Sequence, residues 1–219
     1  MASLVSQHYY SHSPTYPDAE HFKDEYYVCL AGVNHMKQQL YRNRAELPPE
    51  VRISMDEWNV WFAWCRPSSV TDGMFTALAL HMLIEEAEKC GIELACHFEA
   101  INEGLISVTP RTAFLTAQGQ VFTAMKHHAG GTICHSEPDV LVTLRNDLMT
   151  ATVINASFDQ SKSVTLYDLD QPENAVLYTS DAIVPPSFFH DQPVQFTRTD
   201  DSLSTVLPPH SFILLQWKA

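Results

Sequence analysis

The sequence has 219 residues, 45% of them hydrophobic and 18% charged, which is typical of a globular protein that forms its own core. Acidic residues outnumber basic residues by 26 to 13, and the formal net charge is −13. This charge repels polyanions, so neither nucleic acid nor an anionic membrane surface is expected as a partner. No apolar run approaches the roughly 20 residues that a membrane-spanning helix needs.

The N-terminus and the cysteines both favour a cytoplasmic protein. The first residues lack the basic segment and the long apolar segment of a signal peptide. The cysteines are odd in number and lie mostly in apolar segments, which predicts buried free thiols in a reducing compartment. They are Cys29, Cys65, Cys90, Cys96 and Cys134.

The first half of the chain alternates short apolar runs with segments of helical periodicity. A Ser- and Pro-rich loop, ending at Pro17, separates the first two elements, and Gly91 is placed to end the second helix. The expected order is strand 2–7, helix 22–40, strand 51–56, helix 75–89, strand 92–98 and helix 116–128. This alternation predicts a parallel sheet with helical crossovers, but three units cannot close a barrel of about eight strands.

From Thr132 onward, short β-rich runs recur at regular intervals, separated by turn residues. The expected strands are 140–144, 149–154, 163–167, 175–178, 194–197, 202–207 and 212–217. This spacing predicts an antiparallel β-sandwich. We therefore expect an α/β domain over residues 1–131 and an all-β domain over residues 132–219.

Polar and aromatic residues follow each predicted strand of the first half, where parallel α/β folds place their active sites. His8 and Tyr10 follow the first strand, residues 56–61 follow the second, and Glu99 with Asn102 follows the third. In residues 56–61 a carboxylate lies beside Trp and Asn. This suits sugar chemistry, because the indole can stack on a sugar ring and the carboxylate can attack an anomeric carbon.

Residues 56–61 read Asp-Glu-Trp-Asn-Val-Trp, and this hexapeptide resembles the nucleophile strand of glycoside hydrolase family 51, the intracellular α-L-arabinofuranosidases. Residues 6–10, Ser-Gln-His-Tyr-Tyr, resemble the preceding strand of that family. Residues 76–84 and 203–217 resemble its following helix and its closing strands. The resemblance covers essentially the whole chain, and the hexapeptide is its most specific motif.

The resemblance implies a (β/α)8 TIM barrel followed by a β-sandwich, with this chain supplying barrel strands six to eight. It also implies a retaining exo-glycosidase that releases terminal α-L-arabinofuranosyl residues without a cofactor or a metal. Glu57 would be the nucleophile, and Tyr10 would orient it through a hydrogen bond. His8, Asn59 and Trp61 would shape the sugar pocket.

Two departures from the family pattern bear on activity. The family carries its acid/base as the Glu of an Asn-Glu pair on barrel strand four, which this sequence does not contain. Asn102-Glu103 has the same letters but follows the last strand, so the role is not assigned to Glu103. We therefore expect the chain to be inactive alone, and to associate with a complementing N-terminal barrel segment or with a second copy through its open sheet edges.

The second departure is Glu99, which stands where the family has Gln. We expect Glu99 to be a rim carboxylate that contacts substrate; a role as a substitute acid is disfavoured. Of Trp58 and Trp61, only one is expected to contact sugar. His127-His128 and Cys134-His135 hint at metal binding, but their side chains should diverge, and we expect no metal site.

The alternative function is a non-catalytic sugar-binding or interaction module derived from such an enzyme. A Glu at a strand end is often only a solvated carboxylate. The intact surroundings of Glu57, with Tyr10 and Asn59 in place, favour the enzyme.

Overall fold

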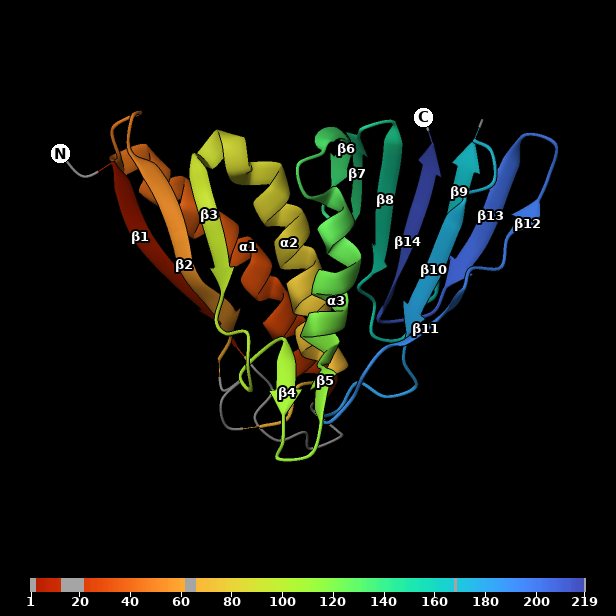
Figure 1. Cartoon of the computed structure of the whole chain (residues 1–219), viewed down its shortest axis with the longest axis horizontal. Helices are drawn as coiled ribbons and strands as arrows, with labels where there is room; N and C mark the ends of the chain where they lie inside the picture. Colours follow the sequence, from red (N-terminus) through yellow and green to blue (C-terminus); the bar gives the residue numbers. More distant parts are fainter. Residues whose placement is uncertain (1–2, 13–21, 62–65, 168, 219) are drawn as a thin grey trace.

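The computed structural model describes residues 3–12, 22–61, 66–167 and 169–218. In Figure 1 a parallel sheet lies on one side, the helices lie in the middle and antiparallel sheets lie on the other side. The first half contains β1 (Leu4–Ser11), α1 (Phe22–Glu46), β2 (Arg52–Val60), α2 (Val70–Cys90), β3 (Ile92–His97), β4 (Ile106–Val108), β5 (Ala113–Leu115), α3 (Ala117–Met125) and the 3-10 turn η1 (Lys126–His128). The second half contains β6 (Thr132–Glu137), β7 (Val140–Arg145), β8 (Leu148–Asn155), β9 (Lys162–Tyr167), β10 (Asn174–Thr179), β11 (His190–Pro193), β12 (Thr197–Arg198), β13 (Ser202–Leu207) and β14 (Ser211–Lys218).

Strands β1, β2 and β3 form a parallel sheet in that order, and α1 and α2 are its crossovers. The predicted alternation and the parallel pairing are confirmed. One end of the first predicted strand, at Ala2, lies outside the described residues, as do Pro17 and part of the predicted loop before α1. The apolar sides of α1, α2 and α3 pack with one face of this sheet into the main hydrophobic core.

Helix α2 carries clear signals at both ends. At its N-terminus, Ser69 and Asp72 form a reciprocal capping box. At its C-terminus, Gly91 adopts φ 68° and donates its N–H to the carbonyls of Ala87 and Glu88, as the sequence predicts. The third helix is shorter than expected, because the α-helix ends at Met125 and continues only as η1.

Strand β2 contains a bulge that decides which way its side chains point. Gln7 of β1 pairs with Met55 but His8 pairs with Glu57, so β2 has one extra residue, Asp56. The residues that face the helical core are Ile53 and Met55 before the bulge and Trp58 and Val60 after it. The alternation therefore changes phase at Asp56, and Glu57 points to the opposite face of the sheet.

The second half forms a six-stranded antiparallel sheet, ordered β11-β10-β14-β8-β7-β6, and a three-stranded sheet, ordered β12-β13-β9. These sheets enclose a second apolar cluster that includes Val164, Ile213 and Leu215. Six of the seven predicted strands are present. The strand predicted at 194–197 is wrong, because residues 194–196 link β11 to β12 and only Thr197 lies in a strand. Strands β6 and β11 were not predicted.

The helical layer and the six-stranded sheet share one core. Phe212 of β14 and Ile154 of β8 belong to the same apolar cluster as the helices. Across this junction, His81 of α2 and His128 of η1 both hydrogen bond to the hydroxyl of Thr152, at 2.6 and 2.9 Å. The boundary at residues 131/132 remains a prediction from the sequence, and apolar contacts run across it.

The cysteines only partly follow the prediction of buried thiols. Cys29 and Cys90 are buried, but Cys96 and Cys134 are exposed, because β3 and β6 are edge strands of their sheets. Cys65 lies outside the described residues. No helix in the described parts of the chain is long and apolar enough to cross a membrane.

Candidate active site

The sequence-predicted site residues lie at the carboxyl end of the parallel sheet, but mostly inside its strands. His8 and Tyr10 belong to β1, and Glu57 and Asn59 belong to β2, so the expectation that they follow the strands is wrong. Both strands run about four residues beyond their predicted ends. They do so because β1 and β2 pair in parallel as far as Ser11 and Val60.

Glu57 is held by two side chains from β1. The Tyr10 hydroxyl donates a hydrogen bond to Glu57 Oε2 at 2.7 Å. His8 Nδ1 lies 3.5 Å from the same oxygen, and Ser6 Oγ lies 3.2 Å from His8 Nε2. The Glu57 side chain is 33% exposed, so a ligand can reach it. This arrangement restrains one carboxylate oxygen, Oε2, through two contacts from β1.

Tyr10 is suited to remain a hydrogen-bond donor. Partial burial, followed by its hydrogen bond to Glu57 and by the charges of Glu57 and Glu103, raises the pKa of Tyr10 well above its usual value. Each of these influences penalises a phenolate, so the proton stays on the tyrosine. Tyr10 also makes edge-on ring contacts with Trp61 and Phe98, at 5.3 and 6.4 Å between centroids.

The two tryptophans of the hexapeptide point in opposite directions. Trp61 is 49% exposed and lies beside Tyr10, where a sugar ring could contact it. Trp58 is fully buried, stacks on Phe122 and lies edge-on to His97. Of the two, only Trp61 is therefore available to a ligand.

Asn59 lies beneath the site and is not on its surface. Its side chain is fully buried, and its amide donates to the carbonyls of Phe98 and Glu103. Its Oδ1 accepts from the backbone of Val60 and from Gln118, each at 2.7 Å. With both ends occupied, Asn59 anchors the loop after β3; its predicted contact with sugar stays a prediction.

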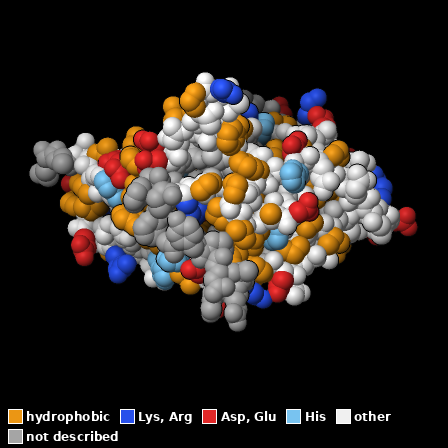
Figure 2. Space-filling model, turned by 90° about the horizontal axis from the view of Figure 1, so that it is seen from below, with side chains coloured by type: hydrophobic (Ala, Val, Ile, Leu, Met, Phe, Trp, Pro, Cys, Tyr) orange, Lys and Arg blue, Asp and Glu red, His pale blue; other side chains and the backbone are white. Residues whose placement is uncertain are grey.

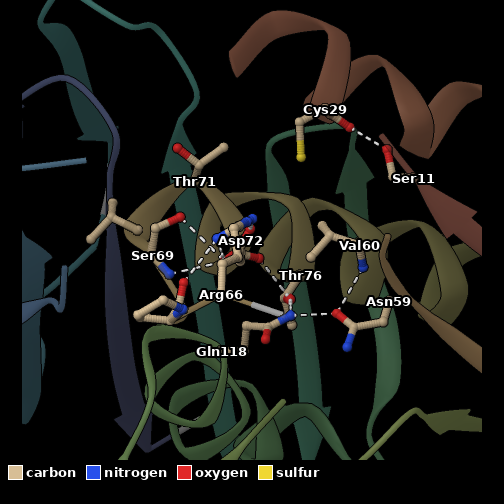
Figure 3. A network of polar contacts seen from close by, with 12 residues as sticks. Ser11, Cys29, Asn59, Val60, Arg66, Ser69, Thr71, Asp72, Thr76 and Gln118 are labelled. Atoms are coloured by element: carbon tan, nitrogen blue, oxygen red, sulfur yellow. Dashed lines mark hydrogen bonds and ion pairs between the residues drawn. The ribbon is translucent and has the colours of Figure 1, made fainter. Parts of the chain in front are cut away.

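Figure 3 shows how this anchor continues into the helices. Gln118 at the start of α3 bridges Asn59 and the Thr76 hydroxyl of α2. Close by, Arg66 forms a two-pronged ion pair with Asp72 at 2.6 and 2.9 Å, with the two side chains only 8% and 2% exposed. The polar network therefore links β2 to both helices beside the site.

The loop after β3 brings two carboxylates to this end of the molecule. Glu99 is exposed. Glu103 is half-buried and close enough for its charge to act on Tyr10. The compact turn depends on Gly104, because a Cβ there would lie 2.2 Å from the Glu99 carbonyl. The sequence analysis assigned no role to Glu103. The glycine that follows it indicates a tight turn at this point.

Two of the histidines whose pattern hints at metal binding have other partners. His128 is buried, and its two ring nitrogens bond to the hydroxyls of Thr143 and Thr152. His135 lies on β6, 3.6 Å from Glu137. Within the described residues, no group of three or more His, Cys, Asp or Glu side chains is arranged to hold a metal ion.

Comparison with known proteins supports the fold through structure alone. No family model and no curated protein sequence matches the chain. The family 51 arabinofuranosidase from Xanthomonas axonopodis pv. citri superposes with a TM-score of 0.76 at 18% identity, covering 98% of this chain and 52% of that one. The α-L-arabinofuranosidase from Thermotoga maritima, in an arabinose complex, gives 0.75 at 17% identity, covering 99% and 53%.

A family 44 xyloglucanase from Paenibacillus polymyxa matches less closely, with a TM-score of 0.63 at 8% identity over 99% of this chain and 47% of that one. The chain thus spans about half the length of the solved structures that it matches. In its fold, this chain resembles the C-terminal part of a glycoside hydrolase family 51 α-L-arabinofuranosidase.

Proposed function

We propose that this chain carries the nucleophile half of a retaining exo-glycosidase that releases terminal α-L-arabinofuranosyl residues from arabinose-containing saccharides. The observation that supports it most is the hydrogen bond of 2.7 Å from Tyr10 to Glu57, on two adjacent strands of a fold shared with arabinofuranosidases. Within that fold, β1, β2 and β3 stand for barrel strands six to eight, and the second half stands for the β-sandwich.

In the proposed reaction, Glu57 Oε1 attacks the anomeric carbon of the arabinofuranosyl group. The bond from that carbon to the leaving oxygen breaks, and the leaving oxygen takes a proton from a general acid. Water then attacks the same carbon, giving its proton to the conjugate base of that acid, and Glu57 is released as a carboxylate. Tyr10 orients Glu57 and keeps it ionised before the attack, and Trp61 provides a flat contact for the sugar.

The general acid is proposed to lie outside these residues. In the family 51 pattern the acid/base stands on barrel strand four, whereas Glu99 and Glu103 both lie in the loop after β3. The partner we propose is an N-terminal barrel segment that pairs with the open edges of the parallel sheet. The four described cysteines are free, and this fits the expected cytoplasmic location.

The test is hydrolysis of an aryl α-L-arabinofuranoside, whose good leaving group needs little help from an acid. The chain would be assayed alone and together with a barrel segment carrying strands one to five of a family 51 enzyme. We expect Glu57→Gln to lower turnover at least about a thousandfold, since an amide cannot form the covalent intermediate. Turnover that survives this substitution would contradict the proposal.

Tyr10→Phe is the matched variant, since it removes only the hydroxyl that bonds to Glu57. We expect kcat to fall about tenfold to a hundredfold, as for the loss of a hydrogen bond to a charged group. His190→Gln, on an exposed strand far along the chain, is the control. If the complemented protein binds arabinose but never turns over substrate, the alternative of a non-catalytic sugar-binding module is favoured.

A further inference from the structure

The loop after β3, residues 98–105, lies at the end of the molecule where the parallel strands end, at the bottom of Figure 1. Its outer side is open, since residues 99–102 are exposed. Figure 2 views the molecule from this end and shows hydrophobic side chains exposed among polar ones across its middle. The loop is therefore held by the side chains beneath it, which come from β2, β3 and the start of α3.

Asn59 of β2 holds this loop near both of its ends. Its side-chain amide donates to the carbonyl of Phe98, where the loop begins, and to the carbonyl of Glu103, at 2.8 Å, where the loop turns back. The two bonds use both protons of the amide, so they form together only while the amide group keeps one orientation. That orientation depends on the groups that bond to Asn59 Oδ1.

Gln118 of α3 fixes the orientation of the Asn59 amide. Gln118 Nε2 donates to Asn59 Oδ1 at 2.7 Å, and the backbone N–H of Val60 donates to the same oxygen (Figure 3). If the Asn59 amide turned over, its protons would face these two donors, and the loop would lose both of its bonds. Gln118 is 1% exposed, so water does not replace it.

The Gln118 side chain is itself held from two elements. Its Nε2 lies 3.2 Å from the Thr76 hydroxyl of α2 and 3.2 Å from His97 Nε2 of β3. Burial lowers the pKa of His97 to about 4, so the ring is neutral at neutral pH and its Nε2 can accept a proton from Gln118. The loop also packs directly on this ring, because a Cβ at Gly104 would lie 2.6 Å from His97 Cε1.

Phe98 connects the loop to the candidate nucleophile. Successive residues of an extended chain point to opposite sides, and His97 packs edge-on against Trp58 of the core. The next residue, Phe98, instead meets the ring of Tyr10, with 6.4 Å between centroids. Strand β2 lies between β1 and β3, so this contact crosses the strand that carries Glu57. The ring of Phe98 therefore limits the directions in which Tyr10 can donate its hydrogen bond to Glu57.

We propose that Gln118 is a positioning residue for Glu57. Through Asn59, Gln118 fixes the loop that carries Phe98, and Phe98 in turn keeps Tyr10 directed at the carboxylate. The proposal rests on the proposed function, in which Glu57 attacks the sugar. Gln118 acts only through other side chains, so it is not a catalytic residue.

The test compares Gln118→Met with Gln120→Met in the 219-residue chain. Both variants replace a glutamine of α3 by an apolar side chain of similar length, and both remove hydrogen bonds. Gln120 is the matched control, because its side chain bonds to the backbone of Phe189, at 2.9 and 3.0 Å, and not to Asn59. Thermal unfolding measures the stability that each variant loses, which a purely structural role would also change.

Two NMR measurements report on position and not on stability. The ring signals of Tyr10, assigned with Tyr10→Phe, should shift in Gln118→Met and keep their parental values in Gln120→Met. The backbone order parameters of residues 98–105 should be about 0.85 in the parent and should fall below about 0.6 in Gln118→Met alone, because the released Asn59 amide no longer holds the loop.

Unshifted Tyr10 signals in Gln118→Met, or equal shifts in both variants, would overturn the proposal. Order parameters below about 0.6 for residues 98–105 of the parent would also overturn it, since the loop would not be held at all. If Gln118→Met does not fold, Gln118→Asn takes its place: it keeps the amide but shortens its reach, and the same shift is expected. Both signals are read without turnover, so a failed hydrolysis assay speaks against the proposed function alone.

Discussion

Strands β3 and β14 are both rich in apolar residues, yet their surroundings are opposite. The first seven residues of β14, from Ser211 to Trp217, are buried, whereas residues 93–96 of β3 are exposed. Strand β14 lies between β10 and β8, and its alternate side chains enter two different cores. Strand β3 has a neighbour on one side only, and Ile92 is its one member of the core cluster, while His97 packs edge-on against Trp58.

The difference shows that the two halves of the chain bury their strands to different degrees. The antiparallel half buries both faces of its central strand. The parallel half buries the face toward the helices and leaves an edge and the other face, which carries Glu57, open. Apolar composition alone therefore does not say which strand is stabilised by burial here.

The same substitution in these two strands should have very different effects on stability. Leu215 in β14 is fully buried, and Leu94 in β3 is 45% exposed. We expect Leu215→Ala to lower the free energy of unfolding by about 2–5 kcal/mol, through lost burial and a cavity. We expect Leu94→Ala to cost less than about 1 kcal/mol. Urea unfolding of both variants measures their free energies of unfolding. Equal losses in the two variants would contradict the expected difference.

Acid should weaken the junction between the two halves. Burial, and then the neighbouring His128, lowers the pKa of His81 to about 3; burial, and then His127, lowers that of His128 to about 4. Below the usual pKa of about 6.5, the unfolded chain binds protons that the folded chain does not. Stability is therefore complete above pH 6.5 and is lost as the pH falls, by about 1.4 kcal/mol per pH unit for each histidine.

The measurement is the free energy of unfolding at pH 7, 6 and 5 in the parent and in His128→Gln. The variant should be less stable at pH 7 but should lose less on acidification. His190→Gln, an exposed histidine in β11, serves as the control and should follow the parent. A pH dependence that is the same in all three proteins would show that the junction is not the acid-sensitive element.

The smallest expected effect is on thiol accessibility. In a Cys65→Ser background, a thiol reagent should label Cys96 and Cys134 quickly in the native chain, and Cys29 and Cys90 only after unfolding. Burial raises the pKa of the Cys29 thiol, which slows its reaction further. A complementing barrel segment that pairs with β3 should protect Cys96 and leave Cys134 reactive. Equal labelling of Cys96 with and without the segment would speak against pairing at that edge.

Local patterns in the sequence predicted most of the elements, because their causes are local. Gly91 ends α2 through its own backbone conformation, and the spacing of apolar residues predicted the helices and most of the later strands. Residues 194–197 were misread since a short β-rich run does not show whether a neighbouring strand is there to pair with it. The chain instead turns from one sheet to the other at this point.

The hexapeptide pointed to Glu57, but neither the interior position of Asn59 nor the position of Glu103 could be predicted from it. Both depend on how the loop after β3 folds back onto β2, a contact between residues more than 40 positions apart. The bulge at Asp56 did leave a signal. Apolar residues stand at odd positions through Met55 and at even positions from Trp58, and this change of phase in one strand predicts an inserted residue.

That bulge means that β2 behaves as two short strands with reversed faces, joined at a single residue. A protein designer who copied the strand as one regular ladder would bury the carboxylate and turn the indole of Trp58 outward. An alignment that placed a gap anywhere else in the strand would assign the wrong residue to the reaction. Removing or adding one residue at Asp56 would thus reverse the face of the sheet to which Glu57 points. The same change in the loop before β2 would leave the pairing of β2 with β1 intact.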